Sequence, residues 1–197
     1  ELEEAPRGAP EDPPLPAEWK SWLTVSILVG IYLNSFLDRQ IMGLLVEDIK
    51  DSLDVSDTQM GWLMGIAFAF FYAIAGLPIG YFVDRKKRTR IIIFGQIFWT
   101  LASFSCGLAT RYWQLFTCRF GVGVGEATLS PSAYSIVADS FPLKKIALAL
   151  GVYGMGVTLG ANVANLVGAW AVGLMEPGVL YEVPVLGERY RWQIVFF

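Results

Sequence analysis

The sequence predicts an all-α protein that crosses a membrane several times. Of the 197 residues, 54% are hydrophobic and only 17% are charged, whereas soluble domains have about 25% charged residues. Apolar runs long enough to cross the roughly 30 Å hydrocarbon core of a bilayer as helices recur along the chain. A soluble chain of this length has no core that could bury several helices that are apolar on every side.

Five complete spans and the beginning of a sixth are expected from these runs. The five runs cover residues 22–46, 60–83, 91–109, 112–138 and 146–175. A further run begins near Trp192 and continues to Phe197, so we expect the chain to stop at the start of a sixth span. Residues 21–197 are therefore predicted to form one truncated transmembrane bundle.

Residues 1–20 differ from the rest of the chain because they are rich in proline and in acidic side chains. Such a stretch has too little apolar surface to fold by itself, and we expect a disordered acidic leader. It lacks the positively charged start and the short apolar core of a signal peptide.

The distribution of basic residues predicts the orientation in the membrane. Residues 85–90, between the second and third spans, are almost all basic, and Lys144 and Lys145 lie between the fourth and fifth. The other connections, 47–57 and 176–188, carry more acidic residues. Basic connections remain in the cytoplasm, so the N-terminus and the connections 85–90 and 139–145 are expected to be cytoplasmic.

The sequence lacks the residues and motifs that metal sites, nucleotide sites and most enzymes require. It has no histidine, which removes the commonest metal ligand and the side chain that titrates near neutral pH. Cys106 and Cys118 lie in apolar spans and are expected to be free thiols that pack as small hydrophobic groups. We expect no metal, no cofactor, no nucleic-acid partner and no enzymatic activity, because no hydrolase, zinc or nucleotide-binding motif is present.

Four ionisable residues remain inside the predicted spans: Asp38, Arg39, Arg119 and Glu126. Each costs roughly 2.5–3.5 kcal/mol in hydrocarbon, so each should face protein or a water-filled cavity. At 1.5 Å per residue, Asp38 lies about 12 Å below the outer end of its span, and Arg119 lies about 10 Å below the outer end of its own. Glu126 is about 10 Å deeper than Arg119 and on the same face of that helix. The alternative is that these residues only form structural ion pairs.

This arrangement suits proton coupling. A carboxylate beside an arginine stays ionised, whereas a carboxylate that loses its partner in an apolar environment takes up a proton. A conformational change that exchanges partners would therefore bind and release a proton at Asp38 or Glu126.

Two segments resemble signatures of the major facilitator superfamily. The first runs from Gly80 to Arg90 and contains a glycine, the pair Asp84-Arg85 and further basic residues between spans two and three; Lys87 replaces the usual glycine. The second runs from Arg119 to Ala127 in span four. The proline of the span-five antiporter motif is absent.

Within that superfamily the sequence is similar to the Spinster family, in its bacterial branch. The segments that carry the similarity are 34–40, 77–80, 123–131 and Arg191-Trp192. The resemblance implies the N-terminal half of a twelve-span transporter in the cell (inner) membrane, which moves lysolipid (lysophospholipid) or sphingolipid-like amphiphiles by proton-linked alternating access. It also implies protonation at Asp38 and Glu126, with Arg39 and Arg119 as charge partners or headgroup ligands, and a cytoplasmic gate formed by Gly80, Asp84, Arg85 and Arg88.

The expected partners are membrane lipids, an amphiphilic substrate, protons and the C-terminal half of the same transporter, with the whole protein a monomer. A carrier or exporter of a small organic anion or drug is the main alternative, because Arg39 and Arg119 would suit a carboxylate as well as an anionic headgroup. A receptor or scaffold is less consistent with the short connections between spans.

Overall fold

The structure, a computed structural model, describes residues 15–184 and 186–197, without the side chains of residues 66 and 67. Most of the predicted leader lies outside the described residues, and the first helix begins at Glu18, inside the stretch 1–20 that the leader was expected to occupy. In chain order the elements are α1 (Glu18–Leu44), α2 (Val46–Leu53), α3 (Asp57–Gly61), the π-helical turn η1 (Trp62–Ile66), α4 (Ala67–Arg85), α5 (Arg88–Cys106), α6 (Tyr112–Glu126), α7 (Leu129–Ser140), α8 (Leu143–Gly173), β1 (Leu180–Val183), β2 (Gly187–Tyr190) and α9 (Arg191–Ile194).

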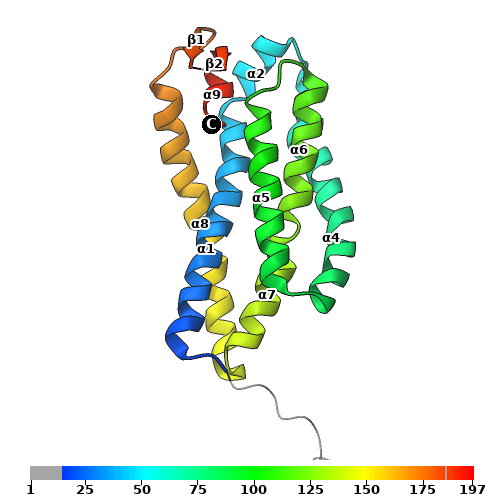
Figure 1. Cartoon of the computed structure of the whole chain (residues 1–197). Coiled ribbons are helices and arrows are strands. Elements are labelled where there is room, and N and C mark those ends of the chain that lie inside the picture. The colour runs from blue at the N-terminus through cyan, green and yellow to red at the C-terminus, as the bar shows by residue number, and fades with distance from the viewer. Residues whose placement is uncertain (1–14, 185) are drawn as a thin grey trace, which may run out of the picture.

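Within the described residues, four helical segments are long and apolar enough to cross a membrane: Glu18–Leu44, Asp57–Arg85, Arg88–Cys106 and Leu143–Gly173. They correspond to the predicted spans one, two, three and five. The prediction of an all-α bundle is thus confirmed for most of the chain, and the long helices run side by side as one elongated bundle (Figure 1).

The fourth predicted span, residues 112–138, is not one continuous helix. It is divided into α6 and α7, with Ala127 and Thr128 between them. Pro131 explains the division, because a proline donates no backbone hydrogen bond and its ring clashes with the carbonyl four residues earlier, here that of Ala127. The Thr128 hydroxyl donates to the carbonyl of Gly125 at 2.8 Å and closes the turn. Glu126 is therefore the last residue of α6.

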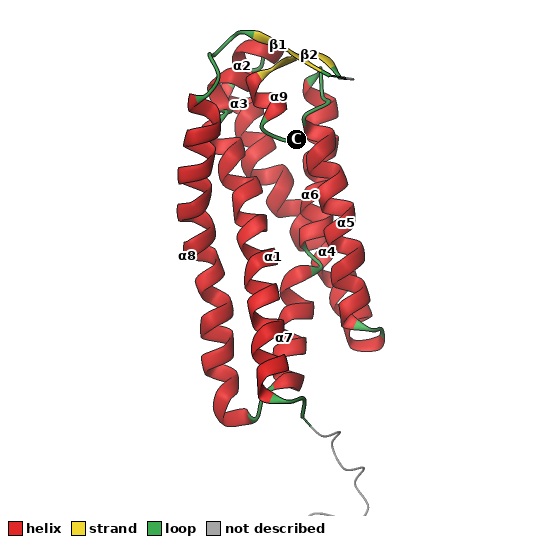
Figure 2. Ribbon diagram, turned by 60° about the vertical axis from the view of Figure 1, so that its left-hand side comes forward, coloured by secondary structure: helices red, strands yellow, loops and turns green. Residues whose placement is uncertain are grey.

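Close packing of α1 against α8 forms one side of the bundle. The two helices run parallel and lie side by side in both views (Figures 1 and 2). Glycine makes this approach possible: a Cβ atom at Gly160 would lie 2.8 Å from the Cβ of Phe36 and 3.1 Å from the Cα of Leu33. Gly156, Gly160 and Gly168 thus serve helix packing, as small residues do in membrane interfaces, whereas Gly151 and Gly154 face open space.

A short hairpin and a single helical turn cover one end of the bundle. Strands β1 and β2 pair in antiparallel fashion, with Leu180 opposite Tyr190, and the sequence did not predict them. Arg191, at the start of α9, forms a partly buried ion pair with Asp48 of α2, and the Trp192 indole donates to the Ser52 hydroxyl at 2.7 Å. These contacts attach the start of the expected sixth span to the connection between spans one and two (Figure 2).

The opposite end contains the basic connections. The Ser21 hydroxyl near the start of α1 donates to the carbonyl of Ser140 at 2.8 Å, and Lys145 pairs with Glu18. The N-terminal part of α1 is therefore fixed to the connection between α7 and α8.

Candidate functional site

The four intramembrane charges predicted from the sequence come from two elements, α1 and α6. Asp38 and Arg39 are consecutive in α1, so their side chains point in different directions. Arg119 and Glu126 lie in α6 and are 2% and 1% exposed. Charges buried this deeply in a membrane protein need partners or a polar cavity.

Arg39 and Glu126 form an ion pair that joins α1 to α6. The Arg39 Nε donates to Glu126 Oε2 at 3.0 Å, and Nη2 donates to the same oxygen. Ser35, one turn before Arg39, also donates to Glu126 Oε2, at 2.8 Å. The other oxygen, Oε1, is buried and has no hydrogen-bond partner among the described residues. One carboxylate oxygen is thus saturated with donors while the second remains available.

Aromatic rings surround the Arg39 guanidinium. Its central carbon lies 5.0 Å from the ring centre of Phe36, 4.8 Å from that of Phe68 and 5.9 Å from that of Tyr72. Phe68 and Tyr72 belong to α4, so three helices meet at this cation. Rings at these distances attract a cation through their π faces and hold Arg39 beside Glu126 although its side chain is 31% exposed.

Asp38 lies on the other side of α1, against α5. Its Oδ2 accepts a hydrogen bond from the Trp99 indole at 2.9 Å, and its Oδ1 accepts one from the Ser103 hydroxyl at 2.6 Å. Both donors are neutral and lie one turn apart on α5. A pocket of about 310 Å³ adjoins this carboxylate and is also lined by Asn34 and Thr100.

Arg119 forms no ion pair within the described part of the chain. Its depth, similar to that of Asp38 in the estimate from the sequence, stays a prediction. Its Nε and Nη1 are buried and find no hydrogen-bond partner among the described residues. Arg119 is thus a buried cation with two nitrogens, Nε and Nη1, that can donate to another group.

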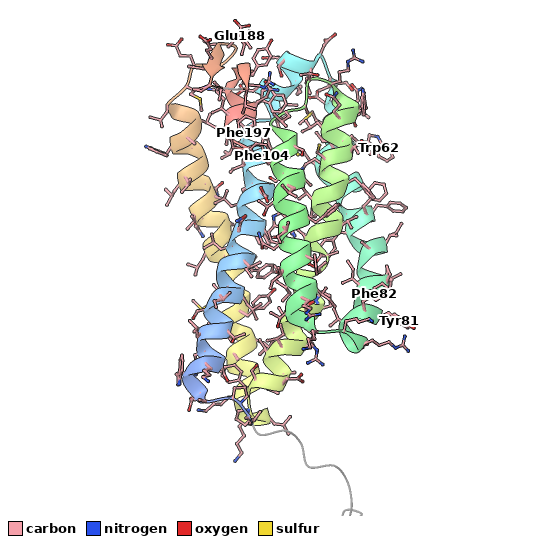
Figure 3. The ribbon with its side chains drawn as sticks, in the orientation of Figure 1. Trp62, Tyr81, Phe82, Phe104, Glu188 and Phe197 are labelled. Atoms are coloured by element: carbon pink, nitrogen blue, oxygen red, sulfur yellow. The ribbon has the colours of Figure 1, made fainter. Side chains whose placement is uncertain are left out.

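The predicted gate residues lie at the basic end of the bundle. Arg88, at the start of α5, forms an ion pair with Asp139 near the end of α7, and the Arg85 guanidinium lies 3.7 Å from the ring centre of Tyr81; Tyr81 and Phe82 are labelled in Figure 3. Gly80 faces open space, and Asp84 has no ion pair within the described part of the chain. Of the four residues, Arg88 alone connects two spans through an ion pair.

Sequence reasoning missed five residues at these sites: Ser35, Tyr72, Trp99, Ser103 and Asp139. The first four are uncharged, so an inspection of intramembrane charges did not select them. Asp139 lies in the connection 139–145, which had been noted only for its lysines.

The described residues contain no cluster of three or more potential metal ligands. Cys106 and Cys118 are free thiols. The chemistry of the site therefore consists of carboxylates, guanidinium groups and neutral hydrogen-bond donors.

The chain is similar to proteins of a known family. The model of the Major Facilitator Superfamily matches residues 28–197. The "Probable L-galactonate transporter" of Escherichia coli is 29% identical over 154 residues, which cover 78% of this chain and 34% of that protein. The sphingosine-1-phosphate transporter SPNS2 of Xenopus tropicalis is 32% identical over 162 residues, or 77% of this chain and 31% of that protein.

A solved structure is also similar. The crystal structure of a bacterial homolog of the human lysosomal transporter Spinster, in an inward-facing and unoccupied conformation, superposes with a TM-score of 0.82 at 33% sequence identity. The match covers 92% of this chain and 40% of that structure. The chain thus spans about a third of the length of these curated relatives and two-fifths of the solved protein.

Proposed function

Because this chain belongs to the major facilitator superfamily, a family of transporters and not of enzymes, we propose that it forms one bundle of a proton-coupled secondary transporter. The proposed cargo is a lysolipid or sphingolipid-like amphiphile, moved by alternating access. The similarity to Spinster proteins and to a sphingosine-1-phosphate transporter supports this class of cargo.

The Arg39–Glu126 pair carries the proposal. It connects spans one and four, and among the described residues only one of the two Glu126 oxygens has hydrogen-bond partners. The carboxylate stays ionised while the guanidinium is beside it. An anionic headgroup that binds Arg39 through charge-assisted hydrogen bonds removes this stabilisation, and Glu126 then takes up a proton. Substrate and proton are thereby linked through one arginine.

Asp38 and Arg119 extend the mechanism in our proposal. Asp38 is the second protonation site, and its neutral donors Trp99 and Ser103 hold it in place, while it forms no ion pair within the described residues. Arg119 has two nitrogens, Nε and Nη1, without a hydrogen-bond partner among the described residues and serves as the second ligand of the headgroup. Guanidinium groups donate strong, charge-assisted hydrogen bonds to phosphate oxygens.

We further propose the orientation and assembly that the sequence predicted. The end with residues 85–90, Lys144 and Lys145 faces the cytoplasm, and with it the N-terminal part of α1. Arg88 and Asp139 latch the cytoplasmic ends of two spans. A second bundle in the same polypeptide completes the substrate cavity, since alternating access requires two bundles that move about a shared site, and the complete transporter is a monomer in the cell membrane.

A carrier of small organic anions is the second candidate. The unpartnered donors of Arg119 fit a carboxylate as well as a phosphate, and the similarity to the L-galactonate transporter points in the same direction. The two candidates differ in the apolar part of the cargo.

The experiment that tests the proposal is uptake by the full-length protein in proteoliposomes under an imposed pH gradient. Lysophospholipid, sphingoid phosphate and a sugar acid are offered separately to the wild type and to Glu126→Gln. Glu182→Gln is the matched control, because Glu182 lies exposed on β1. We expect gradient-driven uptake of the lipids by the wild type and the control and none by Glu126→Gln. Uptake of the sugar acid alone would select the second candidate.

A further inference from the structure

A charged groove lies at the basic end of the bundle, between the start of α5 and the end of α7. It has a volume of about 590 Å³, and its lining includes Lys87, Arg88, Arg90, Ile136 and Asp139. The first part of α5 contacts α7, whereas the rest of α5 lies beside α6 (Figure 1). The groove shares no residue with the Arg39–Glu126 site.

The groove has an excess of positive charge. Three cations line it, and one of them, Arg88, is paired with the single lining carboxylate, that of Asp139. Lys87 and Arg90 are exposed and form no ion pair within the described part of the chain. Two uncompensated cations therefore face a cavity large enough for a phosphate group.

An exposed apolar stripe continues from the groove along α5. Phe94, Ile97 and Leu101 are 72%, 52% and 61% exposed. They follow Arg90 by four, seven and eleven residues, which places all four on one face of the helix. In a membrane, a cation at the end of such a stripe lies at the headgroup level while the stripe faces the acyl chains.

We propose that this groove is a binding site for an anionic phospholipid of the bilayer. The phosphate binds Lys87 and Arg90. Ile136 contacts the part of the acyl chains next to the headgroup, and the rest of the chains lies along Phe94, Ile97 and Leu101. The headgroup carries net negative charge, which complements the two free cations, and a zwitterionic lipid lacks this advantage. The bound lipid is a structural partner of the transporter and is distinct from its cargo.

The test measures the thermal stability of the purified full-length protein in detergent as lipid is added. Phosphatidylglycerol, phosphatidylcholine and soluble glycerol 3-phosphate are the three probes. The groove variant is Lys87→Gln/Arg90→Gln, and the matched control is Lys86→Gln/Lys144→Gln, which removes the same charge from exposed positions outside the groove.

We expect phosphatidylglycerol to stabilise the wild type and the control, with apparent affinity about tenfold lower for the groove variant. Arg90→Lys, which keeps the charge, retains binding.

Three results would overturn the proposal. Equal loss of affinity in the groove and control variants would mean that the effect is diffuse electrostatic attraction. Stabilisation by glycerol 3-phosphate alone, at matched concentration, would identify a site for soluble anions. An equal response to phosphatidylcholine would show that the groove does not recognise headgroup charge.

Discussion

The two intramembrane carboxylates of the bundle, Asp38 and Glu126, meet opposite sides of α1 and have different partners. Glu126 faces a guanidinium, that of Arg39, and leaves one oxygen free. Asp38 faces α5 and receives one neutral donor on each oxygen, from Trp99 and Ser103. Glu126 thus forms an ion pair, whereas the hydrogen-bond partners of Asp38 are neutral.

This difference separates their proposed roles. A substrate anion can compete with Glu126 for Arg39, because both are negative ligands of the same cation. Asp38 forms no ion pair with Arg39 among the described residues, so we propose that its protonation does not compete directly with the substrate.

Replacement of Glu126 should have the greatest effect on transport. In Glu126→Gln the amide keeps a similar size but carries no charge and exchanges no proton, so accumulation driven by a pH gradient should be lost. Arg39 is then free for the anionic substrate, and the affinity for it should rise. Gradient-driven uptake and counterflow exchange, measured in parallel, separate the two effects: exchange should persist. Gradient-driven accumulation at the wild-type level would contradict this role of Glu126.

Removal of Arg39 should cause the largest loss of stability. Arg39→Gln leaves the buried Glu126 carboxylate without its cation, a change that costs about 3–5 kcal/mol in fully buried pairs. Because the Arg39 side chain is 31% exposed, we expect about 1–3 kcal/mol. The loss should appear in equilibrium unfolding of the full-length protein in detergent.

A double-mutant cycle checks that this loss comes from the pair. The double variant Arg39→Gln/Glu126→Gln should be less destabilised than the sum of the two single variants, since each single change leaves one buried group unpaired. Strict additivity would mean that the two side chains do not interact.

Changes around Asp38 should have intermediate effects. Ser103→Ala removes one neutral hydrogen bond to the carboxylate and should cost about 1 kcal/mol of stability. Asp38→Asn should reduce proton coupling while substrate affinity stays close to that of the wild type. Binding isotherms of wild type, Asp38→Asn and Glu126→Gln make the comparison, and equal changes of affinity in the two variants would contradict the separation of roles.

The smallest effect on stability is expected at the Arg88–Asp139 pair. Both side chains are partly exposed, at 30% and 62%, and ion pairs of this kind contribute about 0–1 kcal/mol. Asp139→Asn should therefore leave the melting temperature almost unchanged but shift the balance between conformations. Accessibility of an engineered cytoplasmic cysteine to a thiol reagent measures that balance, and unchanged labelling would mean that the pair is not a latch.

The spans were predictable from the sequence because apolar runs of sufficient length determine them with little dependence on tertiary contacts. The division of the fourth span was missed although Pro131 signalled it, since the apolar run continues unbroken through Ala127 and Thr128. The hairpin at 180–190 was missed because its strands are short and polar and depend on contacts at the end of the bundle.

The members of the charge cluster were also predictable, because charges inside apolar runs are conspicuous. Their pairing was not. Counting residues gives depth along a straight helix but not the rotation of one helix about another, so it did not indicate that Arg39 is the arginine that reaches Glu126. Trp99 and Ser103 were missed since neutral donors are common in membrane helices and identify themselves only when they meet an acceptor.

The central claim is that Glu126 carries the proton that is exchanged when substrate occupies Arg39. The most direct measurement is substrate-induced proton movement by the full-length protein in proteoliposomes that contain a pH-sensitive dye, compared between wild type, Asp38→Asn and Glu126→Gln. We expect a substrate-induced change of dye signal in the wild type, a smaller change in Asp38→Asn and none in Glu126→Gln. Glu126→Gln should nevertheless still bind substrate. A wild-type proton signal in Glu126→Gln would contradict the claim.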